Sequence, residues 1–131
     1  HICNTPIDAF ADTYKRMIQK IKALGKKVAV LNLPPLDADK YFAWICRSNN
    51  AGNIKKWLGG SAHYIYRWQE SYSNAVFEIA NTMKVHFVDI RSAFLGIRNY
   101  TDYICIDGIH PNQKGHELIC KTVNQAYRNA F

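Results

Sequence analysis

Apolar side chains recur at three- and four-residue intervals along residues 7–21, and this spacing predicts an amphipathic helix. Thr5 is expected to cap the helix, Pro6 to occupy its first turn and Asp8 to lie among the free amide groups there. Gly25 is expected to end it. The predicted inward face consists of Ile7, Phe10, Tyr14, Met17, Ile18 and Ile21.

Two short apolar runs are typical of strands in a parallel sheet that is covered on both faces. Residues 28–33 are almost continuously apolar and partly β-branched, and Pro34-Pro35 prevents this strand from continuing. Residues 85–90 form the second run, and a brief extended piece is expected at residues 103–106. The prolines therefore place a loop at the carboxyl end of the first strand.

Further helices are predicted between and after these runs. Residues 38–46 and 53–58 are expected to form short helices, and residues 92–95 a short turn or helix. Residues 61–83 carry apolar side chains at helical spacing and predict a longer one. The last helix is expected to begin near Asn112, a good cap residue. Its predicted inward side chains are Leu118, Ile119, Val123, Ala126 and Tyr127.

The alternation of helices and strands predicts an α/β fold, a three-layer α/β/α arrangement with a parallel sheet between helices. The 131 residues are 48% hydrophobic, which suffices for the core of one domain, and no repeat or linker divides them. However, a sheet of two strands leaves both edges open and cannot cover the apolar faces of several helices. We therefore expect residues 1–131 to be a single domain whose sheet is incomplete.

Charge and composition exclude several classes of protein. The longest apolar runs are far shorter than the roughly 18 to 20 residues that cross a bilayer, so no membrane span is expected. The net charge is +7, but the basic residues are scattered rather than gathered into an arm that would bind nucleic acid. A solvated basic surface is therefore expected in place of a nucleic-acid partner.

The cysteines predict neither a metal site nor a disulfide framework. The chain has four: Cys3, Cys46, Cys105 and Cys120. No CxxC spacing occurs and no histidines are paired at zinc-finger intervals, so no metal ion is expected. The thiols are expected to be buried and to act as small hydrophobic side chains, which favours a reducing compartment such as the cytoplasm.

The candidate chemistry is concentrated in the turn before the last helix. Asp107 and His110 are three residues apart, and Gly108 allows a tight turn between them. Asp107 could accept a hydrogen bond from one ring nitrogen of His110, which leaves the other nitrogen to act as a general base toward a hydroxyl nucleophile. An ordinary Asp-Gly turn is the alternative interpretation of the same residues.

Residues 107–112, Asp-Gly-Ile-His-Pro-Asn, followed by Gly115, resemble the last sequence motif of the SGNH hydrolases, also called GDSL lipases and acylhydrolases. In that family an Asp-x-x-His pair supplies two members of a Ser-His-Asp triad. The resemblance implies a flavodoxin-like sheet of the SGNH type, with Asp107 orienting His110 and His110 serving as general base. The helix and strand before Pro34-Pro35 and residues 88–94 are similar to the parts around the family's fourth and fifth sheet strands.

The family's nucleophilic serine and the Gly and Asn of its oxyanion hole belong to three upstream motifs that do not occur in this sequence. The chain is expected to begin just after the Asn-bearing motif, which would explain why His1 stands where an initiator methionine would be. Gly59-Gly60-Ser61 is not expected to replace the nucleophile, because it follows a predicted helix and Ser61 suits a helix cap.

These observations predict the C-terminal part of a serine ester hydrolase that is inactive alone and needs no cofactor. The expected substrate is an ester or acetylated carbohydrate, and the missing N-terminal segment or a second copy is expected to cover the open sheet edge. Asp89 is expected to cap the turn at Ser92 rather than to reach the rim of the active site.

A non-catalytic module that binds carbohydrate or protein is the alternative function, and a basic nucleic-acid binder is a third. The aromatic residues of the middle third are expected to pack in the core, or else to form a wall or lid for an acyl group. These residues are Trp44, Trp57, Tyr64, Tyr66, Trp68 and Tyr72.

Overall fold

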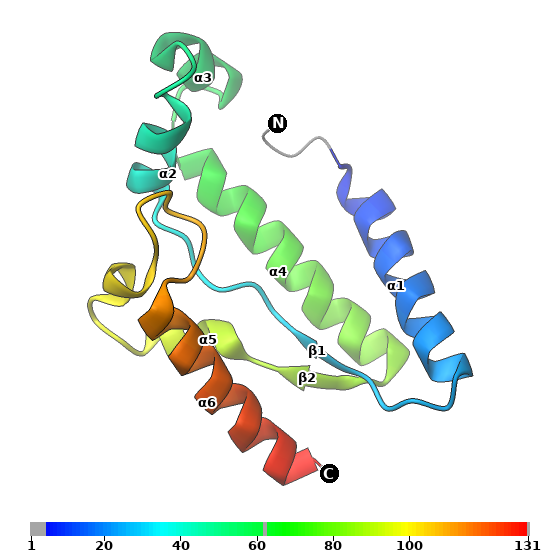
Figure 1. The fold of residues 1–131 in the computed structure, drawn as a ribbon. Helices are drawn as coiled ribbons and strands as arrows, with labels where there is room; N and C mark the ends of the chain where they lie inside the picture. The colour runs from blue at the N-terminus through cyan, green and yellow to red at the C-terminus, as the bar shows by residue number, and fades with distance from the viewer. Residues whose placement is uncertain (1–4, 62, 131) are drawn as a thin grey trace.

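The computed structural model describes residues 5–61 and 63–130, which form an α/β structure with two parallel strands flanked by helices (Figure 1). This confirms the predicted fold class. In chain order the elements are α1 (Ile7–Ala23), β1 (Ala29–Leu31), α2 (Ala38–Ile45), α3 (Ala51–Trp57), α4 (His63–Met83), β2 (His86–Val88), α5 (Ile90–Leu95), the 3-10 helix η1 (Tyr100–Tyr103) and α6 (Gln113–Ala130).

The two strands pair in parallel, with Val30 opposite Phe87, and the crossover between them runs through α2, α3 and α4. The long helix α4 packs beside α1 and against both strands, whereas α6 makes its main sheet contact with β2 (Figure 1). The far edge of β1 has no strand beside it within the described residues. Within the described residues each strand therefore pairs with the other along one edge and has no strand along its outer edge.

Two apolar clusters form the core. One joins α1, β1 and α4 through Ile18, Val30, Val76, Ile79 and Ala80. The other lies among α2, α3 and the start of α4 and contains Leu36, Ala38, Ile54, Leu58 and Ile65. Ile109, from the loop before α6, packs against this second cluster. The loop that carries Asp107 and His110 is thus attached to the helical crossover as well as to α6.

The first helix differs from its prediction in two respects. Its N-cap is Pro6 rather than Thr5, and no side chain caps it by a hydrogen bond. Ile7, Met17 and Ile21, which were predicted to face inward, are exposed. The reason is that α1 makes its main contact with α4, and one helix covers a narrower stripe than the apolar pattern of α1 occupies.

Both strands are three residues long, half the predicted length. Ile90 was predicted to end the second strand but is the first residue of α5, because Asp89 caps that helix by accepting a hydrogen bond from the backbone amide of Ser92 at 2.9 Å. The first strand is not covered on both faces. Ala29 is exposed, because α6 makes its main sheet contact with β2 and leaves this part of β1 uncovered.

The prediction of buried thiols is wrong. Cys120 is exposed on α6, and Cys46 and Cys105 are partly exposed, while Cys3 lies outside the described residues. Tyr127, predicted to face inward from α6, is also exposed. In the part of the chain that the structure describes, no helix combines the length and apolarity of a membrane span, and no group of three or more His, Cys, Asp or Glu side chains is placed to hold a metal ion.

Candidate active site

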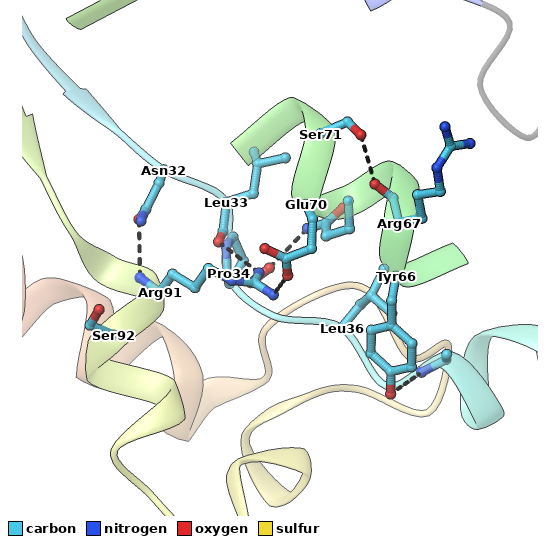
Figure 2. A network of polar contacts seen from close by, with 12 residues as sticks. Asn32, Leu33, Pro34, Leu36, Tyr66, Arg67, Glu70, Ser71, Arg91 and Ser92 are labelled. Atoms are coloured by element: carbon cyan, nitrogen blue, oxygen red, sulfur yellow. Dashed lines mark hydrogen bonds and ion pairs between the residues drawn. The ribbon is translucent and has the colours of Figure 1, made fainter. Parts of the chain in front are cut away.

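A polar network joins the carboxyl ends of the two strands (Figure 2). Asn32, which follows β1 and is 8% exposed, donates its amide to Asp89 Oδ1 at 2.7 Å and accepts from the backbone amide of Arg91 at 3.0 Å. The Arg91 guanidinium in turn pairs with Glu70 of α4. These bonds hold the exits of β1 and β2 at a fixed distance from each other and from α4.

The loop between η1 and α6 carries Asp107 and His110. A single bridge between Ile104 and Pro111 closes it, together with a hydrogen bond of 2.7 Å from the Cys105 amide to the His110 carbonyl. The extended piece predicted before Asp107 is reduced to that one bridge, because η1 occupies its first residue. The loop therefore owes its shape to local hydrogen bonds and to its neighbours rather than to the sheet.

The structure brings Asp107 and His110 into direct contact. His110 Nδ1 lies 2.5 Å from Asp107 Oδ2, and Asp107 Oδ1 accepts from the backbone amides of Ile109 at 3.0 Å and His110 at 3.1 Å. The His110 side chain is 71% exposed, whereas that of Asp107 is 17% exposed. With Nδ1 engaged, Nε2 is the ring nitrogen left to exchange a proton.

The electrostatics of the pair keep Asp107 ionised. Burial acts to raise the pKa of the Asp107 carboxyl, but the hydrogen bonds from the His110 ring and from the amides of Ile109 and His110 outweigh it, so the pKa is lowered. A carboxylate in this state can accept a hydrogen bond from the Nδ1–H group of a neutral imidazole and stabilise the imidazolium that forms when Nε2 is protonated.

The start of α6 holds the loop from one side. Asn112 caps the helix as predicted, since its Oδ1 accepts from the Gly115 amide at 3.2 Å. Its side-chain amide donates to the Asp102 carbonyl at 2.8 Å and its backbone amide to the Tyr103 carbonyl at 2.9 Å. A Cβ at Gly115 would collide with that same Tyr103 carbonyl oxygen and with Pro111. Glycine at this position lets α6 approach η1.

The first turn of α2 holds the loop from the other side, and sequence reasoning missed this contact. Asp37 donates its backbone amide to the Gly108 carbonyl at 2.8 Å and caps α2 by accepting from the Lys40 amide at 3.0 Å. An aspartate just after Pro34-Pro35 is a sequence signal for a helix cap, so the cap could have been predicted. No local sequence pattern indicates that the Asp37 amide binds the Gly108 carbonyl.

The sequence comparison decides the family. A model described as "GDSL-like Lipase/Acylhydrolase family" matches residues 2–118. The chain belongs to this family. This confirms the resemblance of residues 107–112 to the SGNH hydrolases, whose fold the solved structures below share.

Two solved structures resemble this GDSL-family chain in fold. A mutant of an acetyl-xylooligosaccharide esterase from Geobacillus Stearmophilus matches with a TM-score of 0.63 and 18% identity, over 92% of this chain and 46% of that one. LAE5, an alpha/beta hydrolase enzyme from the metagenome of Lake Arreo, Spain, matches with a TM-score of 0.63 and 16% identity, over 96% and 48%. The chain thus spans about half the length of both. No curated protein matches it.

In the part of this GDSL-family chain that the structure describes, no serine is hydrogen-bonded to the His110 ring. Ser61 Oγ accepts from the His63 amide at 3.2 Å, which agrees with its predicted role at the start of α4. Ser92 Oγ donates to Asp89 Oδ2 at 2.6 Å. Asp89 is therefore the cap that the sequence predicts, with Ser92 as its partner.

The aromatic residues of the middle third divide into two groups. Tyr66 and Trp68 pack against the cluster between α2 and α4, in agreement with a core role, and Tyr72 is half-buried. The other three are exposed: Trp44, Trp57 and Tyr64.

Proposed function

We propose that this chain provides the acid–base half of a serine ester hydrolase. The observation that carries the proposal is the 2.5 Å contact between His110 Nδ1 and Asp107 Oδ2 in a chain of the GDSL family. In the proposed reaction, His110 Nε2 takes the proton of a serine hydroxyl as its oxygen attacks the ester carbonyl. The imidazolium then gives this proton to the leaving alcohol, and Asp107 remains ionised throughout. The second half-reaction repeats these steps with water.

We place the nucleophilic serine and the oxyanion donors outside residues 1–131, on a segment that adds a parallel strand beside β1. The open edge of β1 supports this, because no strand pairs with it within the described residues. The matched esterase and hydrolase are about twice as long as this chain, which leaves room for such a segment. A second copy of the chain would cover the edge without supplying a serine.

A fluorophosphonate probe tests the assignment on the complete enzyme. The expected result is a label on one serine outside residues 1–131, and its loss when His110 is replaced by alanine. The 131-residue chain alone is expected to stay unlabelled. A label on one of the chain's five serines would overturn the proposal; these are Ser48, Ser61, Ser71, Ser73 and Ser92.

We propose an ester of a small acyl group, such as an acetylated carbohydrate, as the substrate class. The fold match to an acetyl-xylooligosaccharide esterase supports this choice. Acetate release from acetylated xylooligosaccharides, compared with release from an aryl acetate by the complete enzyme, tests it. Cleavage of the aryl ester alone would place the substrate among simple esters.

A non-catalytic module that binds carbohydrate or protein is the second candidate. The partial exposure of Trp44 and Trp57 favours it, because the parts of these indole rings that Arg47 and Trp68 leave uncovered can contact a sugar or a partner side chain. Replacing His110 with alanine separates the two functions. A binding module would keep its ligand affinity, whereas the esterase would lose turnover by orders of magnitude.

A further inference from the structure

The backbone of the loop between Asp107 and His110 lies directly on the first turn of α2. The Gly108 carbonyl accepts the Asp37 amide at 2.8 Å, and Gly108 has a φ of +78°. A Cβ at Gly108 would come within 3.0 Å of the Asp37 carbonyl oxygen and of the Tyr41 nitrogen and Cα. The first two of these atoms form the opening hydrogen bond of α2, at 2.9 Å. Glycine is thus the residue that lets the two backbones meet.

The first turn of α2 is itself anchored from two other elements. The Tyr66 hydroxyl, on α4, accepts from the Ala38 amide at 3.3 Å, and the Tyr100 hydroxyl, on η1, donates to the Leu36 carbonyl at 3.1 Å. Lys40 Nζ donates to a backbone carbonyl of η1 at 3.0 Å. Figure 2 shows the Tyr66 hydroxyl directed at the start of α2. The turn therefore has a fixed position relative to both α4 and η1.

The Tyr100 hydroxyl remains protonated near neutral pH. Burial, followed by the neighbouring Tyr66, raises the pKa of Tyr100 to about 12. A tyrosine that keeps its proton continues to donate to the Leu36 carbonyl, so this anchor does not change with pH in the neutral range.

We propose that the first turn of α2, residues 37–41, is a positioning element for the acid–base pair, with Gly108 as its contact and Tyr66 and Tyr100 as its anchors. Gly108 lies between the carboxylate of Asp107 and the two amides that this carboxylate binds, so a shift of its backbone moves acceptor and donors apart. The catalytic consequence rests on the proposed function. The positioning itself is a property of this chain, measurable without a serine.

The test uses a matched pair of glycines. Gly108→Ala and Gly25→Ala both place a side chain at a positive φ, +78° and +69°, but a Cβ at Gly25 has nothing within 4 Å. The ¹⁵N chemical shifts of the neutral His110 ring report which nitrogen holds the proton. The wild-type chain is expected to hold it on Nδ1, facing Asp107. Asp107→Ala gives the reference shifts of a His110 ring that has lost its hydrogen bond to Asp107, with the proton mainly on Nε2.

Gly108→Ala is expected to give the ring shifts of Asp107→Ala, and Gly25→Ala those of the wild type, with the far-UV circular dichroism of a folded chain in each. Wild-type ring shifts in folded Gly108→Ala would overturn the proposal. If Gly108→Ala does not fold, the double variant Tyr66→Phe/Tyr100→Phe tests the proposal in its place. The control is Tyr103→Phe, because Tyr103 belongs to the same 3-10 helix as Tyr100. Unchanged ring shifts in the folded double variant would likewise overturn the proposal.

In the complete enzyme the same variants connect position to rate. Displacement of a reacting group by about 1 Å can cost on the order of 10²-fold in rate. The Tyr66→Phe/Tyr100→Phe variant is expected to lower kcat with little change in KM, because the two tyrosines are proposed to act through the position of the acid–base pair. A changed His110 tautomer with an unchanged kcat would support the positioning proposal but refute the role of His110 as base.

Discussion

Asp89 and Asp107 occupy nearly the same local arrangement at two different loops. Each accepts hydrogen bonds from the backbone amide and from the side chain of the residue three positions later. For Asp89 that residue is Ser92, at 2.9 Å and 2.6 Å, and for Asp107 it is His110, at 3.1 Å and 2.5 Å. In both, burial acts to raise the pKa and the hydrogen bonds outweigh it, so each pKa is lowered. Hydrogen bonding of the carboxylate therefore does not distinguish an aspartate that caps a helix from one that is a candidate to orient a catalytic histidine.

The partner side chains make the difference. Ser92 supplies a hydroxyl that does not titrate in the neutral range. Asp89 also accepts a hydrogen bond from the buried side-chain amide of Asn32. His110 supplies an imidazole that is largely exposed, and its second ring nitrogen is a group that can accept or donate a proton. The same acidic turn thus stabilises a helix at one loop and, in the proposed function, orients a base at the other.

The largest expected effect is on activity. In the complete enzyme, Asp107→Asn is expected to lower kcat by about 10⁴-fold, since the amide favours the wrong imidazole tautomer. Asp89→Asn keeps the shape of its carboxyl group and is expected to leave kcat within a few-fold of the wild type. Steady-state kinetics on an acetyl ester measures both. Equal losses in the two variants would show that the two turns do not differ in role.

The Asp89 turn, in contrast, is expected to contribute to stability. Asp89→Ala removes the cap of α5, which costs about 1 kcal/mol, and leaves the Asn32 amide without its acceptor, which costs roughly 1 to 3 kcal/mol more. Urea unfolding of the 131-residue chain measures the sum. Asp8→Ala is the control, because Asp8 lies in the first turn of α1 without capping it, and is expected to cost less than about 1 kcal/mol.

The features that could be predicted from the sequence are local ones. The caps at Asn112 and Asp89 and the contact between Asp107 and His110 each join residues no more than three positions apart, so spacing and residue type suffice to find them. The contact of Gly108 with α2 depends on how distant elements pack, which no local pattern encodes.

The sequence also does not predict how much of the apolar surface of each element is covered by its neighbours. The apolar spacing of α1 correctly predicts a helix, but it does not say how wide a partner the helix meets. Met17 and Ile21 are exposed because α4 covers only part of the apolar stripe. The same holds for β1, whose apolar run predicts cover on both faces while Ala29 lies open.

Acid is expected to destabilise both turns in the same direction. The pKa values of Asp89 and Asp107 are lowered in the folded chain, so their carboxylates stabilise it fully above the unfolded value near 3.8. This stabilisation is lost as the pH falls through the lowered folded values. Unfolding free energies from urea titrations at pH 6, 4 and 3 are expected to fall, and to fall less steeply in Asp89→Asn and in Asp107→Asn. An unchanged slope in either variant would contradict the lowered pKa of that carboxyl.

The smallest expected effect on stability gives the sharpest contrast between the two loops. Ser92→Ala and His110→Ala each remove the side-chain partner of an aspartate and leave the backbone hydrogen bond to it in place. Because both aspartates keep other donors, each substitution is expected to cost about 0.5 to 1.5 kcal/mol of unfolding free energy. The stabilities of the two variants should therefore be alike, while the activity of the complete enzyme should be retained in Ser92→Ala and abolished in His110→Ala. Two variants of equal stability and equal activity would mean that the exposed imidazole is no more than a second cap.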